Sequence, residues 1–214
     1  MDSYLVIARE ADVEIEVRRS RFLTRLRRVE DEDDARAVID TARRDHRTAR
    51  HHCTAFVLGP AGAIARSNDD GEPPGTAGLP MLEALRGAEV SDVVAVVIRY
   101  FGGIKLGTGG LVRAYTDAVV AGLAAAGTVR RGRMQRGTVL VPVAEAGRVE
   151  NELRGSGVAI TGVDYGVDAA ISVAVPAGTW DDLEARVAAL TGGEGLAEPG
   201  AQDWVDLPGR AGRG

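Results

Sequence analysis

Residues 93–113 read VVAVVIRYFGGIKLGTGGLVR and set the expected fold of the first half of the chain. The run Val93–Tyr100 is almost continuously β-branched, which is typical of a central strand with both faces buried. Five glycines follow, and apolar residues then recur at helical spacing from Leu111 to about Gly127. The stretch therefore predicts a buried strand, a glycine-rich turn with Thr108 as helix N-cap, and a long helix.

Outside this stretch, apolar periodicity predicts alternating strands and helices. Before it we expect strands at Tyr4–Ala8, Val13–Val17, Arg21–Val29 and His51–Leu58, helices at Glu30–Asp45 and Pro80–Gly87, and a loop at 67–79. After it we expect strands at Thr138–Val143, Ala159–Tyr165, Ala169–Val175 and Gln202–Val205, with helices at Glu145–Arg154 and Thr179–Leu190. The second set has the order βαββαβ of the ferredoxin-like split unit.

These patterns divide the chain into two α+β domains. Of the 214 residues, 45% are apolar and 27% charged, which is ordinary for a folded chain and excludes general disorder. We expect a first domain at 1–127, a basic linker at 128–136, a ferredoxin-like domain at 137–206 and a disordered tail at 207–214. The linker is assigned because TVRRGRMQR lacks any apolar period.

Composition also limits the classes of function. The longest apolar stretches have about five residues, far fewer than the roughly 18 that span a bilayer, and the N-terminus has no signal-peptide pattern. The single cysteine, Cys53, excludes an internal disulfide framework and a four-cysteine zinc site. We expect a cytoplasmic protein without membrane contact, and its oligomeric state stays open.

Charge is unevenly distributed along the chain. Residues 137–206 hold 3 basic and 12 acidic side chains, a net charge of −9 that would repel a phosphate backbone. Any nucleic-acid contact is therefore expected on the first domain or the linker. Arginines cluster there, and they form either an RNA-facing patch or ion pairs with the acids interspersed among them: Arg18, Arg19, Arg21, Arg25, Arg27, Arg28, Arg43, Arg44, Arg47 and Arg50. Aromatic residues make up only 4%, which argues against single-strand stacking platforms, and no sequence-specific DNA binding is expected.

The glycine-rich stretch is the first candidate site. Free N–H groups at a helix start attract anions, glycine lets a ligand approach the backbone, and three cations lie nearby. An anion or phosphate site is one reading, and a tight strand-to-helix turn without a ligand is the other. The glycine spacing matches neither a Walker loop nor a dinucleotide fingerprint. The candidate residues are Arg99, Tyr100, Gly102, Gly103, Lys105, Gly107, Thr108, Gly109, Gly110 and Arg113.

The acidic loop at 68–78 is the second candidate site. Its carboxylates could ligate Mg²⁺, act in acid–base chemistry, pair with Arg99 and Lys105, or contact a partner. Its candidate residues are Asp69, Asp70, Glu72, Gly75 and Thr76. Strand alternation at His51-His52-Cys53 leaves at most two ligands on one face, so these residues are expected in the core or at its rim. No catalytic residue, metal site or cofactor is predicted.

Four motifs together resemble the bacterial YigZ group of the IMPACT family over residues 1–127. They are Ser20-Arg21-Phe22, His51-His52-Cys53, Asp69–Gly78 and Arg99–Gly107, with Pro74 standing where the family usually has Ser. The resemblance implies a first domain with the left-handed βαβ topology of a ribosomal small-subunit protein, followed by a ferredoxin-like second domain. It also implies RNA or ribosome binding for the bacterial members, and it brings no settled catalytic activity.

Three hypotheses follow from the residues and the resemblance. The first is a non-catalytic, translation-associated regulatory protein that binds RNA, the ribosome or a translation factor through the glycine-rich basic loop. The alternative is a Mg²⁺-dependent phosphate- or nucleotide-binding enzyme that uses the same loop with Asp69, Asp70 or Glu72. A third is an interaction module whose acidic second domain docks a basic partner. Under the first two, we expect the two loops to share one cleft.

Overall fold

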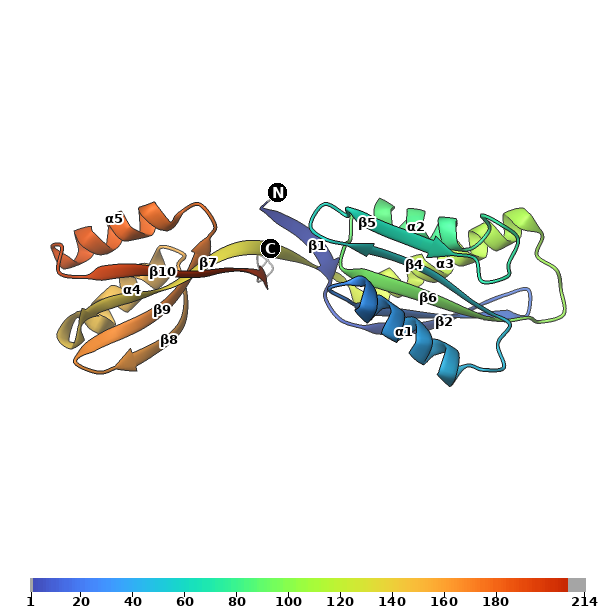
Figure 1. Cartoon of the computed structure of the whole chain (residues 1–214), viewed down its shortest axis with the longest axis horizontal. Coiled ribbons are helices and arrows are strands. Elements are labelled where there is room, and N and C mark those ends of the chain that lie inside the picture. The colour runs from blue at the N-terminus through green and yellow to red at the C-terminus, as the bar shows by residue number, and fades with distance from the viewer. Residues whose placement is uncertain (1, 208–214) are drawn as a thin grey trace, which may run out of the picture. The chain divides into compact units, whose positions relative to one another are not determined.

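The computed structural model describes residues 2–207 and divides into two compact units, Ser3–Arg130 and Arg131–Leu207 (Figure 1). Both units combine helices with a β-sheet, so the predicted two-domain α+β class is confirmed. Apart from Leu207, the tail predicted at 207–214 lies outside the described residues. No helix within residues 2–207 has the length and hydropathy needed to cross a bilayer.

The first unit is organised around a five-stranded antiparallel sheet in the order β2-β3-β6-β4-β5. Its strands are β2 (Ala11–Val17), β3 (Ser20–Arg28), β4 (His51–Leu58), β5 (Ile64–Asn68) and β6 (Val93–Tyr100). The β-branched strand β6 is central, as predicted. Its register sets Arg99 opposite Phe22 of β3 on one side and opposite His51 of β4 on the other. The site described below is built on this row of residues.

Helices cover both faces of this sheet. Helix α1 (Glu32–Asp45) packs on one face, and α2 (Gly78–Gly87) with α3 (Thr108–Ala126) packs on the other (Figure 1). Residues 93, 95 and 97 of β6 join the α2–α3 core, whereas residues 94, 96 and 98 join the α1 core. Because both faces of β6 are buried, its sequence is apolar without alternation.

Strand β5 was not predicted from the sequence. Its residues Ile64–Asn68 are mostly exposed, because β5 is an edge strand paired only with β4. A strand with little burial on either face leaves no period of two in its sequence. Pairing with β4 places it in the sheet, and of its side chains only Ala65 packs against the core.

The second unit has the predicted βαββαβ order. It contains β7 (Thr128–Pro142), a 3₁₀ turn (Val143–Glu145), α4 (Ala146–Gly155), β8 (Ala159–Tyr165), β9 (Asp168–Pro176), α5 (Trp180–Thr191) and β10 (Leu196–Asp206). Its strand order, β10-β7-β9-β8, is fully antiparallel, and β1 (Ser3–Ile7) also pairs with β7. Helices α4 and α5 share one core with the sheet, as in a ferredoxin-like fold.

Residues 128–136 belong to strand β7, where the sequence predicts a linker. The division between the units falls inside this segment, after Arg130. Strand β10 supplies backbone partners from Arg131 and β9 from Met134, with Trp204 opposite Arg133 and Asp206 opposite Arg131. The buried positions of the segment include Gly132 and Gln135 as well as Met134, so its sequence shows no apolar period of two.

Candidate functional site

The two candidate loops meet in a pocket of about 420 Å³ in the first unit, called the loop pocket below. Its walls come from the start of β4, the acidic loop, the glycine-rich loop and the first turns of α3. The lining residues are Arg50, His51, Glu72, Pro73, Arg99, Phe101, Lys105, Leu106, Gly107, Thr108 and Leu111. The expected common cleft is therefore present in the structure.

A buried ion pair lies in the wall of the loop pocket. Glu72 Oε1 accepts a hydrogen bond from Arg99 Nη1 at 2.6 Å, and the side chains of Glu72 and Arg99 are only 4% and 7% exposed. The hydroxyl of Tyr115, from α3, donates to the same oxygen at 2.9 Å. Two donors on one oxygen hold this carboxylate in a fixed position.

The guanidinium of Arg99 is itself packed between aromatic rings. Its Cζ lies 5.4 Å from the ring centroid of Phe22 and 5.7 Å from that of Phe101. Its Nη2 lies 3.4 Å from Ser20 Oγ, which also accepts a hydrogen bond from the backbone N–H of Gly102 at 3.2 Å. These contacts tie the glycine-rich loop to the ion pair and to β3.

His51 presents a hydrogen-bond acceptor beside Glu72. Its Nδ1 lies 2.9 Å from the backbone carbonyl oxygen of Asp70, and a carbonyl only accepts, so Nδ1 carries the proton. In the neutral ring Nε2 is then unprotonated, and this atom lies 4.0 Å from Glu72 Oε1. One wall of the loop pocket therefore offers two acceptors.

Two of the three acidic candidates organise the acidic loop instead of facing a ligand. The Asp69 carboxylate accepts hydrogen bonds from the backbone N–H groups of Gly75, Ala77 and Gly78 at 2.8–2.9 Å, which caps α2. Asp70 accepts from the His52 backbone N–H at 2.7 Å and from Arg43 at 3.0 Å. Within residues 2–207, no group of three His, Cys, Asp or Glu side chains is arranged to hold a metal ion.

The capping role of Asp69 makes a pH-dependent prediction. Partial burial raises the pKa of the Asp69 carboxyl, but the three backbone donors outweigh it and hold the pKa below its usual value. We expect Asp69→Ala to lower the free energy of unfolding by about 1–2 kcal/mol at pH 7. A depressed folded-state pKa gives stability that is present above about pH 4 and is lost as the pH falls through the folded-state value.

Urea unfolding of both proteins between neutral and acidic pH tests this prediction. The difference between wild type and Asp69→Ala should shrink as the carboxyl is protonated. Asp117→Ala, which removes an exposed acid on α3, is the control and should change little. A constant difference across the pH range would contradict the capping role.

The glycine-rich loop ends at a helix start without a side-chain cap. Gly107 is the N-cap of α3 with φ +73°, and as a glycine it supplies no side-chain cap hydrogen bond to the helix. The prediction that Thr108 caps the helix is therefore wrong. Thr108 is the first helical residue, because only a residue that tolerates a positive φ fits the preceding turn.

Several predicted residues do not reach the loop pocket. Tyr100 alternates to the α1 face of β6, where its hydroxyl lies 3.0 Å from His46 Nδ1. Arg113, with Gly109 and Gly110, lines a separate pocket of about 300 Å³ that also contains Arg18. Thr76 donates to the Pro73 carbonyl at 2.7 Å within the acidic loop. Gly75 supplies one of the N–H groups bound by Asp69, whereas Gly102 and Gly103 form the turn after β6.

Other residues in or near the loop pocket are not among the site residues predicted from the sequence. They are Ser20, Arg50, His51, Phe101, Leu106, Leu111 and Tyr115. His51 and Ser20 lie in the motifs that carry the family resemblance, which is the one signal in the sequence for them. Phe101 and Leu106 lie in the Arg99–Gly107 motif and Arg50 in the arginine cluster, whereas Tyr115 is brought to the site by packing of α3 alone.

Cys53 lies in the core, as predicted. It is fully buried, its thiol donates to the Asp69 carbonyl at 3.0 Å, and its sulfur lies 3.2 Å from the Tyr115 hydroxyl. Burial raises the pKa of this thiol to about 12, so a thiolate nucleophile is disfavoured at neutral pH.

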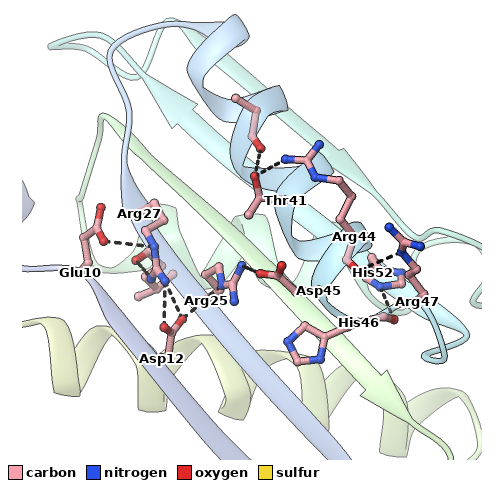
Figure 2. Close-up of polar contacts among 12 residues, drawn as sticks. Glu10, Asp12, Arg25, Arg27, Thr41, Arg44, Asp45, His46, Arg47 and His52 are labelled. Atoms are coloured by element: carbon pink, nitrogen blue, oxygen red, sulfur yellow. Dashed lines mark hydrogen bonds and ion pairs between the residues drawn. The ribbon is translucent and has the colours of Figure 1, made fainter.

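Many of the clustered arginines are paired with acids. Figure 2 shows Arg27 bonded to Glu10 and Asp12, and Arg25 bonded to Asp45, on the side of the sheet that faces α1. Arg21 pairs with Glu14 in the same way. For these arginines the structure supports pairing with neighbouring acids, the second of the two alternatives given above. Across residues 2–207, no acidic side chain lies within ion-pair distance of Arg50, Lys105 or Arg113.

Comparison with known proteins places this site within a described family. Residues 18–123 match the model of the Impact N-terminal domain, and residues 142–194 match a domain of unknown function, DUF1949. The chain is 42% identical over 77% of its length to the IMPACT family member YvyE of Bacillus subtilis, of which 76% is covered. It is 37% identical over 90% of its length to the IMPACT family member YigZ of Escherichia coli, of which 96% is covered. A crystal structure of a hypothetical protein aligns with a TM-score of 0.63 and 37% identity, covering 92% of this chain and 97% of that one.

Proposed function

Because this chain belongs to the IMPACT family, we propose that it is a non-catalytic, translation-associated protein that binds RNA, free or in the ribosome, through the glycine-rich loop. One observation carries the proposal. Arg50 and Lys105 line the loop pocket with Gly107 and Thr108 at the start of α3, Arg113 lines the neighbouring pocket with Gly109 and Gly110, and all three cations are exposed. Cations and free backbone N–H groups at a helix start are the donors that bind phosphate.

The alternative of a Mg²⁺-dependent enzyme is less well supported. The Asp69 carboxylate accepts hydrogen bonds from backbone N–H groups, and the Asp70 carboxylate accepts one from Arg43. The Glu72 carboxylate is paired with Arg99. Mg²⁺ is held by several oxygen ligands together, and no group of three His, Cys, Asp or Glu side chains within residues 2–207 is arranged to hold a metal ion. We therefore favour binding without catalysis.

Co-sedimentation with ribosomes and with bulk RNA over a salt series tests the proposal. The variant is Lys105→Ala with Arg113→Ala, and the control, Arg36→Ala with Arg86→Ala, removes the same charge from exposed sites on α1 and α2. We expect the wild type and the control to bind, with affinity falling as salt rises. Loss of two phosphate contacts should reduce the slope of log K against log salt by about 1.5 and weaken binding about tenfold or more at low salt.

Other outcomes of this experiment count against the proposal. If both double variants bound RNA equally well, the glycine-rich loop would not be the RNA contact. No binding by the wild type at low salt would exclude RNA as the partner. A Mg²⁺-dependent thermal shift with a nucleotide, in a protein that does not bind RNA, would favour the enzyme.

A further inference from the structure

We propose that the loop pocket holds a single unstacked nucleotide, with the phosphate at Lys105 and the start of α3 and the base against Phe101. For a nucleotide within RNA, this inference rests on the proposed function. For a free nucleotide it stands by itself. Three kinds of lining residue point to this ligand: the acceptors Glu72 and His51, which form the acceptor wall, the cations Arg50 and Lys105, and the exposed aromatic ring of Phe101.

The acceptor wall requires a hydrogen-bond donor on the ligand. The Glu72 carboxylate is held by Arg99 and Tyr115, and a carboxylate only accepts hydrogen bonds. In its neutral form, the His51 ring presents Nε2 as a second acceptor 4.0 Å from Glu72 Oε1. A ribose hydroxyl or an exocyclic base amine fits this wall, whereas a second phosphate would be repelled.

The cations of the loop pocket require an anion. The pocket is lined by Lys105 and Arg50 together with Gly107 and Thr108, where the backbone enters α3 without a side-chain cap. A ligand that fills the loop pocket must therefore carry both negative charge and hydrogen-bond donors. A nucleoside monophosphate carries both.

Phe101 offers a stacking surface in the loop pocket. It is 46% exposed although it lines the pocket, and the Arg99 guanidinium lies against its ring. Composition alone argues against stacking platforms, and the structure does not provide a row of exposed aromatic rings. Phe101 is the exposed ring at the loop pocket, and the exposed ring of Tyr165 belongs to the second unit, so the pocket suits one base. The volume of about 420 Å³ is within the range of small-ligand sites.

The test is a titration of the full chain that is monitored by protein NMR. The ligands are inorganic phosphate, ribose 5-phosphate and each of the four nucleoside monophosphates. Labelled single-stranded and duplex RNA are then compared by fluorescence anisotropy. The variant is Phe101→Ala, which removes an exposed ring and should not impair folding. The control is Tyr165→Ala, which removes a 65% exposed ring on β8 of the second unit.

We expect mononucleotides to bind more tightly than ribose 5-phosphate and to shift resonances of Phe101 and Lys105. Phe101→Ala should weaken mononucleotide and single-stranded RNA binding about tenfold, as loss of one stacked base does, and leave phosphate binding unchanged. Duplex RNA should be insensitive to the variant, because its bases are not available. Tyr165→Ala should match the wild type.

The two proposals fail in different ways. Nucleotide binding that is unaffected by Phe101→Ala, or no stronger than that of inorganic phosphate, would overturn the nucleotide pocket. Ribosome binding that needs Lys105 and Arg113 would survive that result and keep the proposed function. Phe101-dependent binding of free mononucleotides without any RNA or ribosome binding would keep the pocket, identify its ligand as a free nucleotide, and overturn the proposed function.

Discussion

Replacing Arg99 with alanine should destabilise the first unit by about 3–5 kcal/mol, because the change leaves the Glu72 carboxylate buried without its charge partner. The side chain of Glu72 is only 4% exposed, so water cannot take the place of the guanidinium without opening the pocket wall. The ring contacts of Arg99 with Phe22 and Phe101 are lost at the same time. Urea unfolding followed by circular dichroism measures the change.

A second variant separates unpaired charge from lost packing. In Arg99→Met with Glu72→Leu, both charges are replaced by apolar groups of similar length, and much of the lost stability should return. Recovery would show that the pair is retained for the pocket and not for stability. A loss below about 1 kcal/mol in Arg99→Ala, the range of an exposed pair, would contradict the buried position of Glu72.

The main elements of the fold could be predicted from local sequence patterns. The β-branched run at Val93–Ile98 identifies a strand covered on both faces, and the structure buries its alternate residues in two cores. Strand β5 and the first half of β7 could not be predicted, because β5 is mostly exposed and the buried positions in the first half of β7 include Gly132 and Gln135. A period of two appears in a sequence only where one face of the strand buries apolar side chains.

The candidate site was predictable as two loops but not as a set of side chains. Glu72, Arg99, Lys105, Gly107 and Thr108 line the loop pocket, whereas Tyr100 does not. Alternation along a strand turns Tyr100 to the face opposite Arg99, and nothing in the local sequence tells which face carries the pocket. His51 lines the loop pocket because the register of β4 sets it opposite Arg99. Register depends on the whole sheet, so no local pattern contains it.

Asp69 shows a second limit of the sequence. Three carboxylates in four residues are equally consistent with a metal site and with a loop held by its own backbone. In the structure the Asp69 carboxylate binds three backbone N–H groups of its own loop, and the Glu72 carboxylate forms an ion pair with Arg99. The distinction depends on where the N–H groups of residues 75–78 point, which the composition of the loop does not show.

The glycines of the candidate loop should differ sharply in what they tolerate, and Gly102 is the one that fixes the geometry. A Cβ at Gly102 would lie 2.0 Å from the carbonyl oxygen of Arg19, inside the two-residue turn between β2 and β3. Arg18 and Arg19 both have positive φ in that turn, at 48° and 65°, so the turn has little freedom to move away. Gly102→Ala should therefore displace the loop and cost about 1–3 kcal/mol.

Gly109 supplies the matched comparison, because a Cβ there meets nothing within 4 Å and the residue already lies in the first turn of α3. Gly109→Ala should leave the unfolding free energy unchanged or raise it by up to about 1 kcal/mol, since alanine is the better helix former. Thermal unfolding and amide NMR spectra of both variants measure the contrast. Equal stability of the two would contradict the contact between Gly102 and the Arg19 turn. Disturbed resonances at Ser20 and Phe101 in Gly102→Ala alone would show that this contact positions the loop beside Arg99, where Ser20 Oγ accepts the Gly102 N–H.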